Sequence, residues 1–202
     1  MLTIEKQPLI LASASPRRQE LLREAGIPFQ TRPAHIPEER ILGEAAVDYA
    51  QRLSREKALA VARHLPGRFV LGADTVVVLN GVVLNLNEDE DVLEKPRDHH
   101  DAARMLRLLS GRSHKVITGV TLLTPAGSVD TRACTTQVFF RELTEQEIHT
   151  YVATHEPMDK AGAYAIQGGA ACFVDHVDGE YSNVVGLPLP LVAEMLRANN
   201  FM

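Results

Sequence analysis

Apolar positions recur along this chain in two rhythms, one that suits helices and one that suits strands. Serine, threonine or aspartate stands before several helical stretches, and glycine or Pro-Gly follows several of them, as at natural helix starts and stops. At Ser15-Pro16, for example, the serine suits a helix cap and the proline suits the first turn. The pattern predicts five or six helices, the clearest over residues 15–26, 44–64, 98–109, 145–155 and 187–199.

The strand-like stretches are rich in β-branched residues and are bounded by turn signals. The pattern predicts strands over residues 8–13, 69–79, 82–84, 114–123 and 129–140, and two more near Gly168-Gly169 and Asp178-Gly179. Asn80-Gly81 indicates a tight hairpin between the second and third of these. Because helices alternate with strands while several neighbouring strands form hairpins, we expect an α/β fold with a mixed sheet of seven or eight strands. Residues 1–202 are expected to form a single domain.

Composition narrows the class of protein. Hydrophobic residues make up 45% of the 202 positions and charged residues 23%, as in an ordinary globular chain. A net charge of −5 argues against a broad basic face for nucleic acid. No apolar run approaches the roughly 20 residues that span a bilayer, and the N-terminus lacks the features of a signal peptide. Two cysteines, Cys134 and Cys172, make no disulfide framework, so we expect a cytoplasmic protein without a membrane or nucleic-acid partner.

Residues 13–18, Ser-Ala-Ser-Pro-Arg-Arg, lie where a predicted strand ends and a predicted helix begins. Free backbone N–H groups and the helix dipole make such a junction attractive to anions. Arg17 and Arg18 add forked donors that suit phosphate oxygens, and Ser13 adds a hydroxyl. Positive charge in a first turn opposes the dipole, which favours a phosphate site over the alternative of two solvated arginines.

Lys57 and Asp74 are charged residues at positions where the pattern predicts burial. Lys57 falls on the apolar arc of the helix over 44–64, and Asp74 interrupts the apolar strand over 69–79. Lys57 either snorkels to water or places its ammonium in a polar site. Asp74 is either a structural carboxylate bound by nearby amides or a functional one, and the cost of burying an unpaired charge favours function. Gly72 suits a bulge or a close backbone approach.

Several other positions carry weaker signals. Taken alone, Lys95 and Glu38 look like ordinary surface residues. They become candidates for the same site only together with the charged residues described above. His99-His100-Asp101 is interpreted as a solvated first turn, and Cys172 as a packed thiol in an apolar strand rather than a nucleophile. The sequence has no Gly-x-x-x-x-Gly-Lys-Ser/Thr phosphate loop and no Cys-x-x-Cys or His-Glu-x-x-His zinc motif.

These residues, in this order, resemble the motifs of the Maf family of nucleoside triphosphate pyrophosphatases. The similar motifs are residues 11–22, 55–58, 71–75, 94–98, 109–111, 118–120, 159–168 and 185–189, which together extend over nearly the whole chain. Each motif is weak by itself, whereas eight in register are a strong signal. The resemblance implies a Maf/ITPase-like fold, in which an elongated, twisted, mixed sheet is flanked by helices and two lobes enclose a nucleotide-binding cleft.

The resemblance also implies a reaction, which is hydrolysis of a nucleoside triphosphate between its α and β phosphates with the help of Mg²⁺, or alternatively Mn²⁺. Asp74 would be the general base or a metal-linked activator of water, and Glu38 a second carboxylate for the metal. The cations expected to hold the triphosphate are Arg17, Arg18, Lys57 and Lys95, with Ser13 nearby. Lys57 and Lys95 are counted with Asp74 as catalytic, since phosphoryl transfer depends mainly on charge neutralisation and positioning. The family further implies a homodimer.

Segment 163–168, Ala-Tyr-Ala-Ile-Gln-Gly, resembles the branch of the family that acts on dTTP, UTP and related modified pyrimidine nucleotides. In that branch the positions of Arg17, Thr75 and Gln167 influence specificity. A glutamine amide offers a donor and an acceptor, which suits the imide edge of uracil or thymine. The alternatives are a pyrophosphatase for 7-methyl-GTP or another non-standard purine nucleotide, and a nucleotide-binding regulator of cell division without turnover.

Residues 85–92 depart from the family pattern, which runs from the hairpin to Glu94-Lys95-Pro96 with little between. This stretch is acidic, and we interpret it as an insertion that bulges into solvent and leaves Lys95 in place. The alternative is that it displaces Lys95 and weakens catalysis.

Overall fold

One mixed sheet of seven strands forms the centre of the computed structural model, which describes residues 7–79 and 91–202. The strands are β1 (Leu9–Leu11), β2 (Phe29–Thr31), β3 (Val70–Leu79), β4 (Asp91–Leu93), β5 (Ser113–Leu123), β6 (Val129–Phe140) and β7 (Val174–Asp178). The α-helices are α1 (Pro16–Glu24), α2 (Ala46–Ala62), α3 (His99–Leu109), α4 (Glu145–Val152), α5 (Tyr181–Val185) and α6 (Leu189–Ala198). Three 3₁₀ turns lie between α4 and β7, namely η1 (Glu156–Asp159), η2 (Ala161–Ala163) and η3 (Gly169–Phe173).

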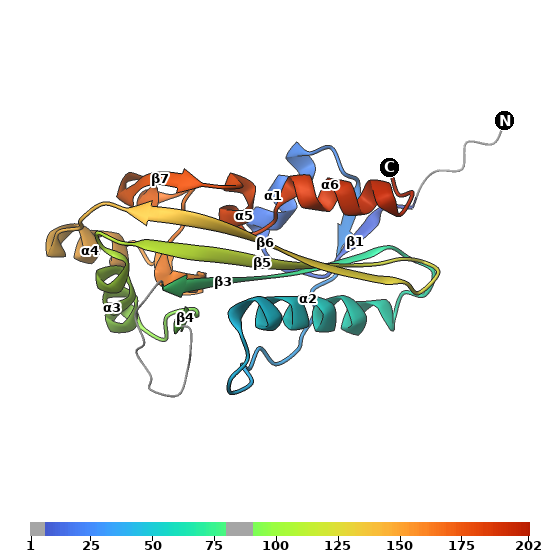
Figure 1. Ribbon diagram of the computed structural model, residues 1–202, viewed down its shortest axis with the longest axis horizontal. Helices are drawn as coiled ribbons and strands as arrows, with labels where there is room; N and C mark the ends of the chain where they lie inside the picture. The colour runs from blue at the N-terminus through green and yellow to red at the C-terminus, as the bar shows by residue number, and fades with distance from the viewer. Residues whose placement is uncertain (1–6, 80–90) are drawn as a thin grey trace.

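The sheet is mixed because one side of it is parallel and the rest is antiparallel. β1 pairs in parallel with both β2 and β3, whereas β3, β5, β6 and β7 follow one another in antiparallel order. The long strands β3, β5 and β6 run along most of an elongated molecule (Figure 1). α2 covers one face of these strands, α1 and α6 lie on the other face, and α3 and α4 lie at one end (Figure 1). The predicted mixed α/β sheet flanked by helices is confirmed.

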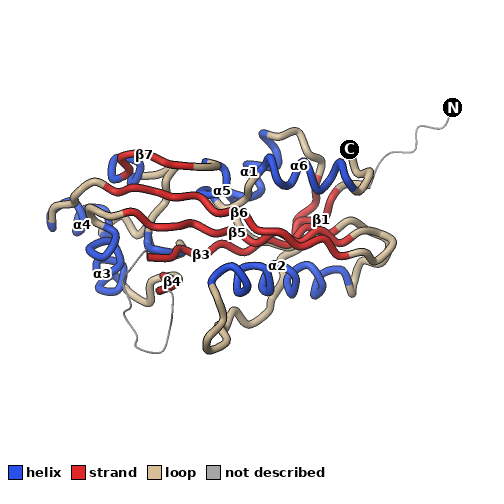
Figure 2. The backbone as a smooth tube through the Cα atoms, in the orientation of Figure 1, coloured by secondary structure: helices blue, strands red, loops and turns tan. Residues whose placement is uncertain are grey.

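β3 has an interruption in its pairing on one side. It pairs with β5 along its full length, while β1 and β4 lie at opposite ends of its other side (Figure 2). β1 pairs with it only at Val70 and Leu71, and β4 only at residues 77–79. Among the described residues, none forms a strand partner for positions 72–76 on that side. This interruption, the β3 gap, contains Asp74 and leaves a stretch of strand free to line a cavity.

Successive residues of β3 face opposite sides of the sheet, and each side has its own apolar core. Ala73 and Val77 belong to the larger core, which also contains buried residues of α1 and α6. Val76 and Val78 pack instead with buried residues of α2. Asp74 shares the alternation of Val76 and Val78, so its side chain faces α2.

α2 lies close to the sheet because two glycines remove side chains from the contact. A Cβ atom on Gly72 would lie 2.1 Å from the carbonyl oxygen of Ser54, and one on Gly119 would lie 2.3 Å from that of Ala50. Any larger residue would push the helix away from the strands. The close backbone approach that the sequence favours at Gly72 is confirmed, and it brings α2 within side-chain reach of the β3 gap.

The local signals for helix starts agree with the structure. Ser15 caps α1, Asp98 caps α3, and Thr144 forms a capping box with Glu147 at the start of α4. The helix predicted over 44–64 is α2, Ala46–Ala62. No α-helix within the described ranges is both long enough and apolar enough to cross a membrane.

Other predicted elements differ from the structure. The helix predicted over 187–199 begins at Leu189, and the separate helix α5 ends before Gly186, whose φ of +125° breaks the chain direction. The strand predicted near Gly168-Gly169 is wrong, because this segment forms η2 and η3. β2 carries no period-2 signal in its three residues and is not predicted.

The region after β3 is covered only in part. The Asn80-Gly81 hairpin, the strand predicted over 82–84 and most of the 85–92 insertion lie outside the described residues. Asp91, expected in a loop, is the first residue of β4, which pairs antiparallel with β3. Two side chains also differ from their interpretation: Cys172 is exposed and lies in η3, and Asp101 is buried.

Candidate active site

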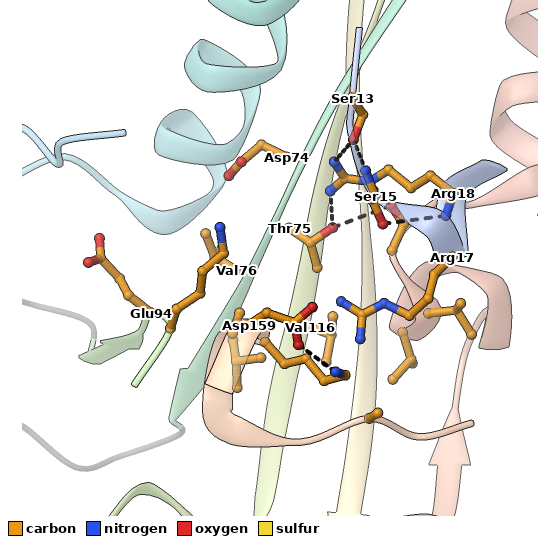
Figure 3. Close-up of a pocket in the computed structure, with 18 of the residues that line it drawn as sticks. Ser13, Ser15, Arg17, Arg18, Asp74, Thr75, Val76, Glu94, Val116 and Asp159 are labelled. Carbon is orange, nitrogen blue, oxygen red and sulfur yellow. Dashed lines mark hydrogen bonds and ion pairs between the residues drawn. The ribbon is translucent and has the colours of Figure 1, made fainter. Parts of the chain in front are cut away.

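A cavity of about 470 Å³ opens at the β3 gap. Its walls come from the end of β1, the start of α1, from α2 and β3, and from the irregular segments around residues 38, 94 and 159–167. All nine candidate residues line it: Ser13, Arg17, Arg18, Glu38, Lys57, Asp74, Thr75, Lys95 and Gln167. In Figure 3, Asp74 lies beside α2, and Thr75 lies beside Arg18 of α1. The structure therefore gathers every candidate residue around one space.

Lys57 extends from α2 into the cavity. Its side chain is 9% exposed, as is that of Asp74. The Lys57 ammonium donates to Asp74 Oδ1 at 2.7 Å and lies 2.6 Å from Glu38 Oε1. The lysine is thus held between a buried and an exposed carboxylate, and removing one member would leave a buried charge uncompensated. The ammonium is therefore paired inside the protein instead of extending to water, so the snorkelling alternative is wrong, and the role of Lys57 in catalysis stays a prediction.

Glu38 lies in the loop before α2, and Lys95 follows β4. Burial favours the neutral form of Glu38, but the hydrogen bond and charge of Lys57, followed by the charge of Lys95, hold the pKa of its carboxyl below the ordinary value. Lys95 Nζ lies 3.8 Å from Glu38 Oε2, at the limit of an ion pair, and the Lys95 side chain is 62% exposed. Lys95 therefore lies in the cavity wall next to the Glu38–Lys57 pair and keeps its donors available for another anion.

Arg18 is engaged by the protein itself. Its guanidinium donates four hydrogen bonds of 2.8 to 3.1 Å, to the carbonyl oxygens of Gly186 and Ala73 and to the hydroxyl oxygens of Ser13 and Thr75. A guanidinium has five N–H donors, so one is left for a ligand. Arg18 satisfies a carbonyl of the β3 gap and ties α1 to β3 and to the turn after α5. Its contribution to the site is first of all to hold these elements in place.

Arg17 differs from its neighbour. It lines the cavity and has no hydrogen-bond or ion-pair partner within the described part of the chain. Figure 3 shows its guanidinium turned toward Asp159. Burial opposes ionisation of Asp159, but Lys160 and then the charge of Arg17 lower the pKa of its carboxyl. All five donors of Arg17 are therefore available to an anion that enters the cavity.

The hydroxyls of Ser13 and Thr75 belong to the network around Arg18. Ser13 Oγ accepts from the Ser15 N–H at 3.2 Å as well as from Arg18. Thr75 Oγ1 lies 2.9 Å from Thr118 Oγ1 and accepts from Arg18 at 2.9 Å. Both hydroxyls thus lie at the junction of α1 and β3, where they hold the guanidinium in place.

Gln167 lies in the irregular segment between η2 and η3, in another wall of the cavity. Its neighbours Tyr164 and Ile166 are buried in the larger apolar core, whereas Gln167 is exposed. Its amide has no hydrogen-bond partner among the described residues. The donor and the acceptor of the amide are therefore both available to a ligand.

The cavity wall also contains polar residues that are not among the candidates, including Tyr49, Glu94, Asp159 and Lys160. Tyr49 Oη lies 3.1 Å from the main-chain carbonyl of Glu38 and 3.1 Å from Glu94 Oε1. Burial and the charge of Glu94 raise the pKa of Tyr49. Tyr49 thus holds the Glu38 loop against the segment after β4. Glu94, Asp159 and Lys160 stand inside the family motifs and were visible there, whereas Tyr49 has no signal beyond that of a core aromatic.

Comparison with known proteins gives matches over almost the whole chain. A family model described as Maf-like protein matches residues 8–199. The dTTP/UTP pyrophosphatase of Geobacter metallireducens is 52% identical over 194 residues, which cover 96% of this chain and 96% of that protein. Proteins of the same name from Koribacter versatilis and Exiguobacterium sibiricum are 53% and 50% identical, over 94% and 98% of this chain and 93% and 95% of theirs. Among solved structures, the Staphylococcus aureus Ham1 protein matches 95% of this chain and 99% of its own at 11% identity, with a TM-score of 0.49.

Proposed function

This chain belongs to the Maf-like protein family, and from that premise we propose that it is a nucleoside triphosphate pyrophosphatase acting on dTTP, UTP and related modified pyrimidine nucleotides. The observation that carries the proposal is the cavity at the β3 gap, where buried Asp74 is paired with Lys57 beside cations that keep free donors. The name shared by relatives of about 50% identity supports the choice of substrates.

The proposed reaction transfers the nucleotidyl group to water. A water oxygen forms a bond to the α-phosphorus, the bond from that phosphorus to the α–β bridging oxygen breaks, and pyrophosphate leaves. Asp74 takes up the proton that the water loses, which makes it the general base. The ammonium of Lys57 lies 2.7 Å from Asp74 Oδ1 and keeps the carboxylate oriented, and both side chains are largely shielded from solvent.

The triphosphate brings several negative charges into the cavity, and two cations are assigned to them. Within the described residues, Arg17 has no hydrogen-bond or ion-pair partner, and the one ion pair of Lys95 is a 3.8 Å contact to Glu38. Arg18 offers one remaining donor and otherwise positions Ser13 and Thr75. Fixed positive charge of this kind stabilises phosphoryl transfer because the transition state concentrates charge on the phosphate oxygens.

A divalent cation, Mg²⁺ or alternatively Mn²⁺, is part of the proposal. The carboxylates of Asp74 and Glu38 converge on the Lys57 ammonium, which bonds one oxygen of each. The second oxygen of each carboxylate is not bonded to Lys57, and hard cations prefer such ligands. Within the described residues, no group of three or more histidine, cysteine, aspartate or glutamate side chains is placed to hold a metal. The residues therefore fit a metal that is bound jointly by these two carboxylates and by substrate phosphates, the usual mode for Mg²⁺. When bound, it would neutralise phosphate charge and polarise the reacting centre.

Gln167 is assigned to the base. Its amide is exposed in the cavity wall with its donor and acceptor free, and the imide edge of uracil or thymine presents the complementary pair. A cytosine presents a different pattern of donors and acceptors, so a fixed amide would discriminate against it. Thr75 and Arg17 complete the proposed specificity set, Thr75 through its hydrogen bond to Arg18 and Arg17 through its free guanidinium.

The test is pyrophosphate release from purified protein with Mg²⁺ and each of dTTP, UTP, CTP, GTP and 7-methyl-GTP. We expect kcat/KM for dTTP and UTP to exceed the others by at least about 10-fold. EDTA should abolish release, and added Mg²⁺ or Mn²⁺ should restore it. Release from 7-methyl-GTP alone would overturn the pyrimidine branch. Tight binding without any release would favour the non-catalytic regulator.

The homodimer, the cytoplasmic location and the lack of nucleic-acid and membrane partners stay predictions. Analytical ultracentrifugation of the full chain checks the first of them, with a mass of about twice 22.2 kDa as the expected result.

A further inference from the structure

The segment that carries Gln167 is tied on both flanks to one pair of side chains. The Ala165 N–H donates to Tyr151 Oη at 3.0 Å, and the Gly169 N–H donates to Glu156 Oε2 at 3.1 Å. The two side chains are joined, because Tyr151 Oη donates to Glu156 Oε1 at 3.3 Å. This relay, the Tyr151–Glu156 clasp, holds the backbone two residues before and two residues after Gln167.

The clasp is itself firmly anchored. Tyr151 lies on α4, is 4% exposed, and packs edge-on against Phe173 with ring centroids 5.3 Å apart. The main-chain carbonyl of Glu156 accepts from Lys160 Nζ at 2.7 Å. Burial, together with the neighbouring Glu156 carboxylate, raises the pKa of Tyr151, so the hydroxyl keeps its proton at neutral pH. Neither Tyr151 nor Glu156 lines the cavity, so neither is placed to touch a bound nucleotide.

Gly168 shows how tightly the clasp fits this segment. A Cβ atom there would lie 1.8 Å from Glu156 Oε1. The φ of Gly168 is −111°, outside the left-handed region, so its conformation does not demand glycine. A Cβ atom there would instead have to displace the Glu156 carboxylate, which is the flexible end of its side chain. The residue next to Gln167 is therefore matched to the clasp.

From these contacts we propose that Tyr151 and Glu156 are positioning residues, which set the placement of the Gln167 amide against the pyrimidine base. The inference rests on the proposed function, in which Gln167 contacts the base. Residues 164–168 pair with no strand of the described sheet, so their backbone lacks the support that β3 gives to Asp74. The clasp supplies that support. The Gln167 amide must bond a donor and an acceptor of the base at the same time, and it depends on accurate placement because hydrogen bonds weaken steeply with misalignment.

The test compares Tyr151→Phe, Glu156→Gln and Gly168→Ala with the wild type. We expect KM for dTTP and UTP to rise about fivefold to tenfold with kcat within about twofold, because binding of the base is lost equally in the ground and transition states. Preference over CTP should fall by a similar factor. Inhibition by tripolyphosphate, which has no base, should be unchanged. Glu145→Gln is the matched control, since it removes an ion pair with Arg107 from the same helix α4 and should leave all constants unchanged.

A double-variant cycle separates positioning from general support. In a Gln167→Ala background, Tyr151→Phe should have no further effect on KM, because its effect passes through Gln167. Full additivity, or a parallel weakening of tripolyphosphate inhibition, would overturn the inference. If the wild type hydrolyses dTTP and all three variants keep its KM, the inference is also overturned. A wild type that releases no pyrophosphate from dTTP or UTP overturns the proposed function and this inference with it. Should one variant fail to fold, judged by its melting temperature, the other two decide.

Discussion

The two ends of the cavity are built in different ways. At one end, which we assign to catalysis and call the catalytic end, Lys57, Asp74 and Arg18 project from α2, β3 and α1. All three are buried and paired with the protein's own groups. At the other end, which we assign to the nucleotide base and call the base end, Gln167 is exposed on irregular backbone, and the Tyr151–Glu156 clasp bonds the segment that carries it. Regular elements in very close contact fix the first end, and a few hydrogen bonds fix the second. In the proposed function, catalysis and base selectivity therefore depend on separate contacts, and we expect variants to affect one without the other.

The largest effect is expected at the catalytic end, from Asp74→Asn. The amide keeps the shape of the carboxylate but cannot take a proton from water, so kcat should fall by about 10³-fold while nucleotide binding is largely preserved. Turnover measured under saturating dTTP, with binding followed by calorimetry, checks this. Activity equal to that of the wild type would exclude Asp74 as the general base, and the end of the cavity around it would no longer be assigned to catalysis.

The adjacent arginines give a comparison within the catalytic end. Arg18→Ala removes four hydrogen bonds and leaves buried acceptors at Ala73 and Gly186, so the free energy of unfolding should fall by about 3 kcal/mol. Arg17→Ala removes no hydrogen bond or ion pair within the described residues, so it should change stability little and raise KM for dTTP about tenfold. Urea denaturation and steady-state kinetics on both variants decide. The reverse assignment of effects would show that Arg17 is the structural residue.

Lys57→Met tests whether the buried lysine serves chemistry or packing. Methionine suits the apolar surroundings of α2 but cannot pair with Asp74 or Glu38, so kcat of the folded protein should fall by about 100-fold. The buried Asp74 left without its partner should also lower the melting temperature. Thermal melting and kcat are measured together. A collapse of the melting temperature with normal specific activity in the folded fraction would assign Lys57 to structure.

The smallest effect concerns α3, which packs against η2 at the base end. Burial opposes ionisation of Asp101, yet hydrogen bonds from Arg104 and Arg97 lower its pKa to about 2. Because the folded pKa lies below the ordinary 3.8, the carboxylate contributes stability above about pH 4 and loses it as pH falls toward 2. Asp101→Asn should therefore lower the free energy of unfolding by about 1 kcal/mol at pH 7, an amount limited by the exposure of both arginines.

The pH dependence of that difference sharpens the last comparison. Denaturation of the wild type and of Asp101→Asn is measured in steps from pH 7 to pH 3, and the gap between them should narrow below pH 4. A gap that stays constant down to pH 3 would mean that the variant acts through packing instead of charge.

Much of the catalytic end could be predicted from the sequence because its signals are local. A lysine on an apolar helix face and an aspartate inside an apolar strand are visible without a structure, and so is the serine cap before Pro16. The bond of Lys57 to Glu38 and the engagement of Arg18 with Gly186 were not visible, because both depend on segments that meet only in the folded chain.

The base end shows where sequence patterns fail. Tyr164, Ile166, Ala170 and Phe173 are all buried, so their apolar character resembles that of a strand. The backbone instead forms 3₁₀ turns, fixed by tertiary contacts such as those from Tyr151 and Glu156. β2 was not predicted because it has only three residues, the central one exposed, which is too short a stretch to show an alternation of apolar and polar positions.

The β3 gap has a consequence for association between chains. An uncovered stretch of strand is a template on which a foreign strand can add, and natural sheets discourage this with charged side chains at such places. Here the guanidinium of Arg18 occupies the carbonyl of Ala73, and the Lys57–Asp74 pair stands beside it. Arg18 thus takes the place of a strand partner at Ala73. We expect a variant without this side chain to leave that carbonyl open to pairing with another chain.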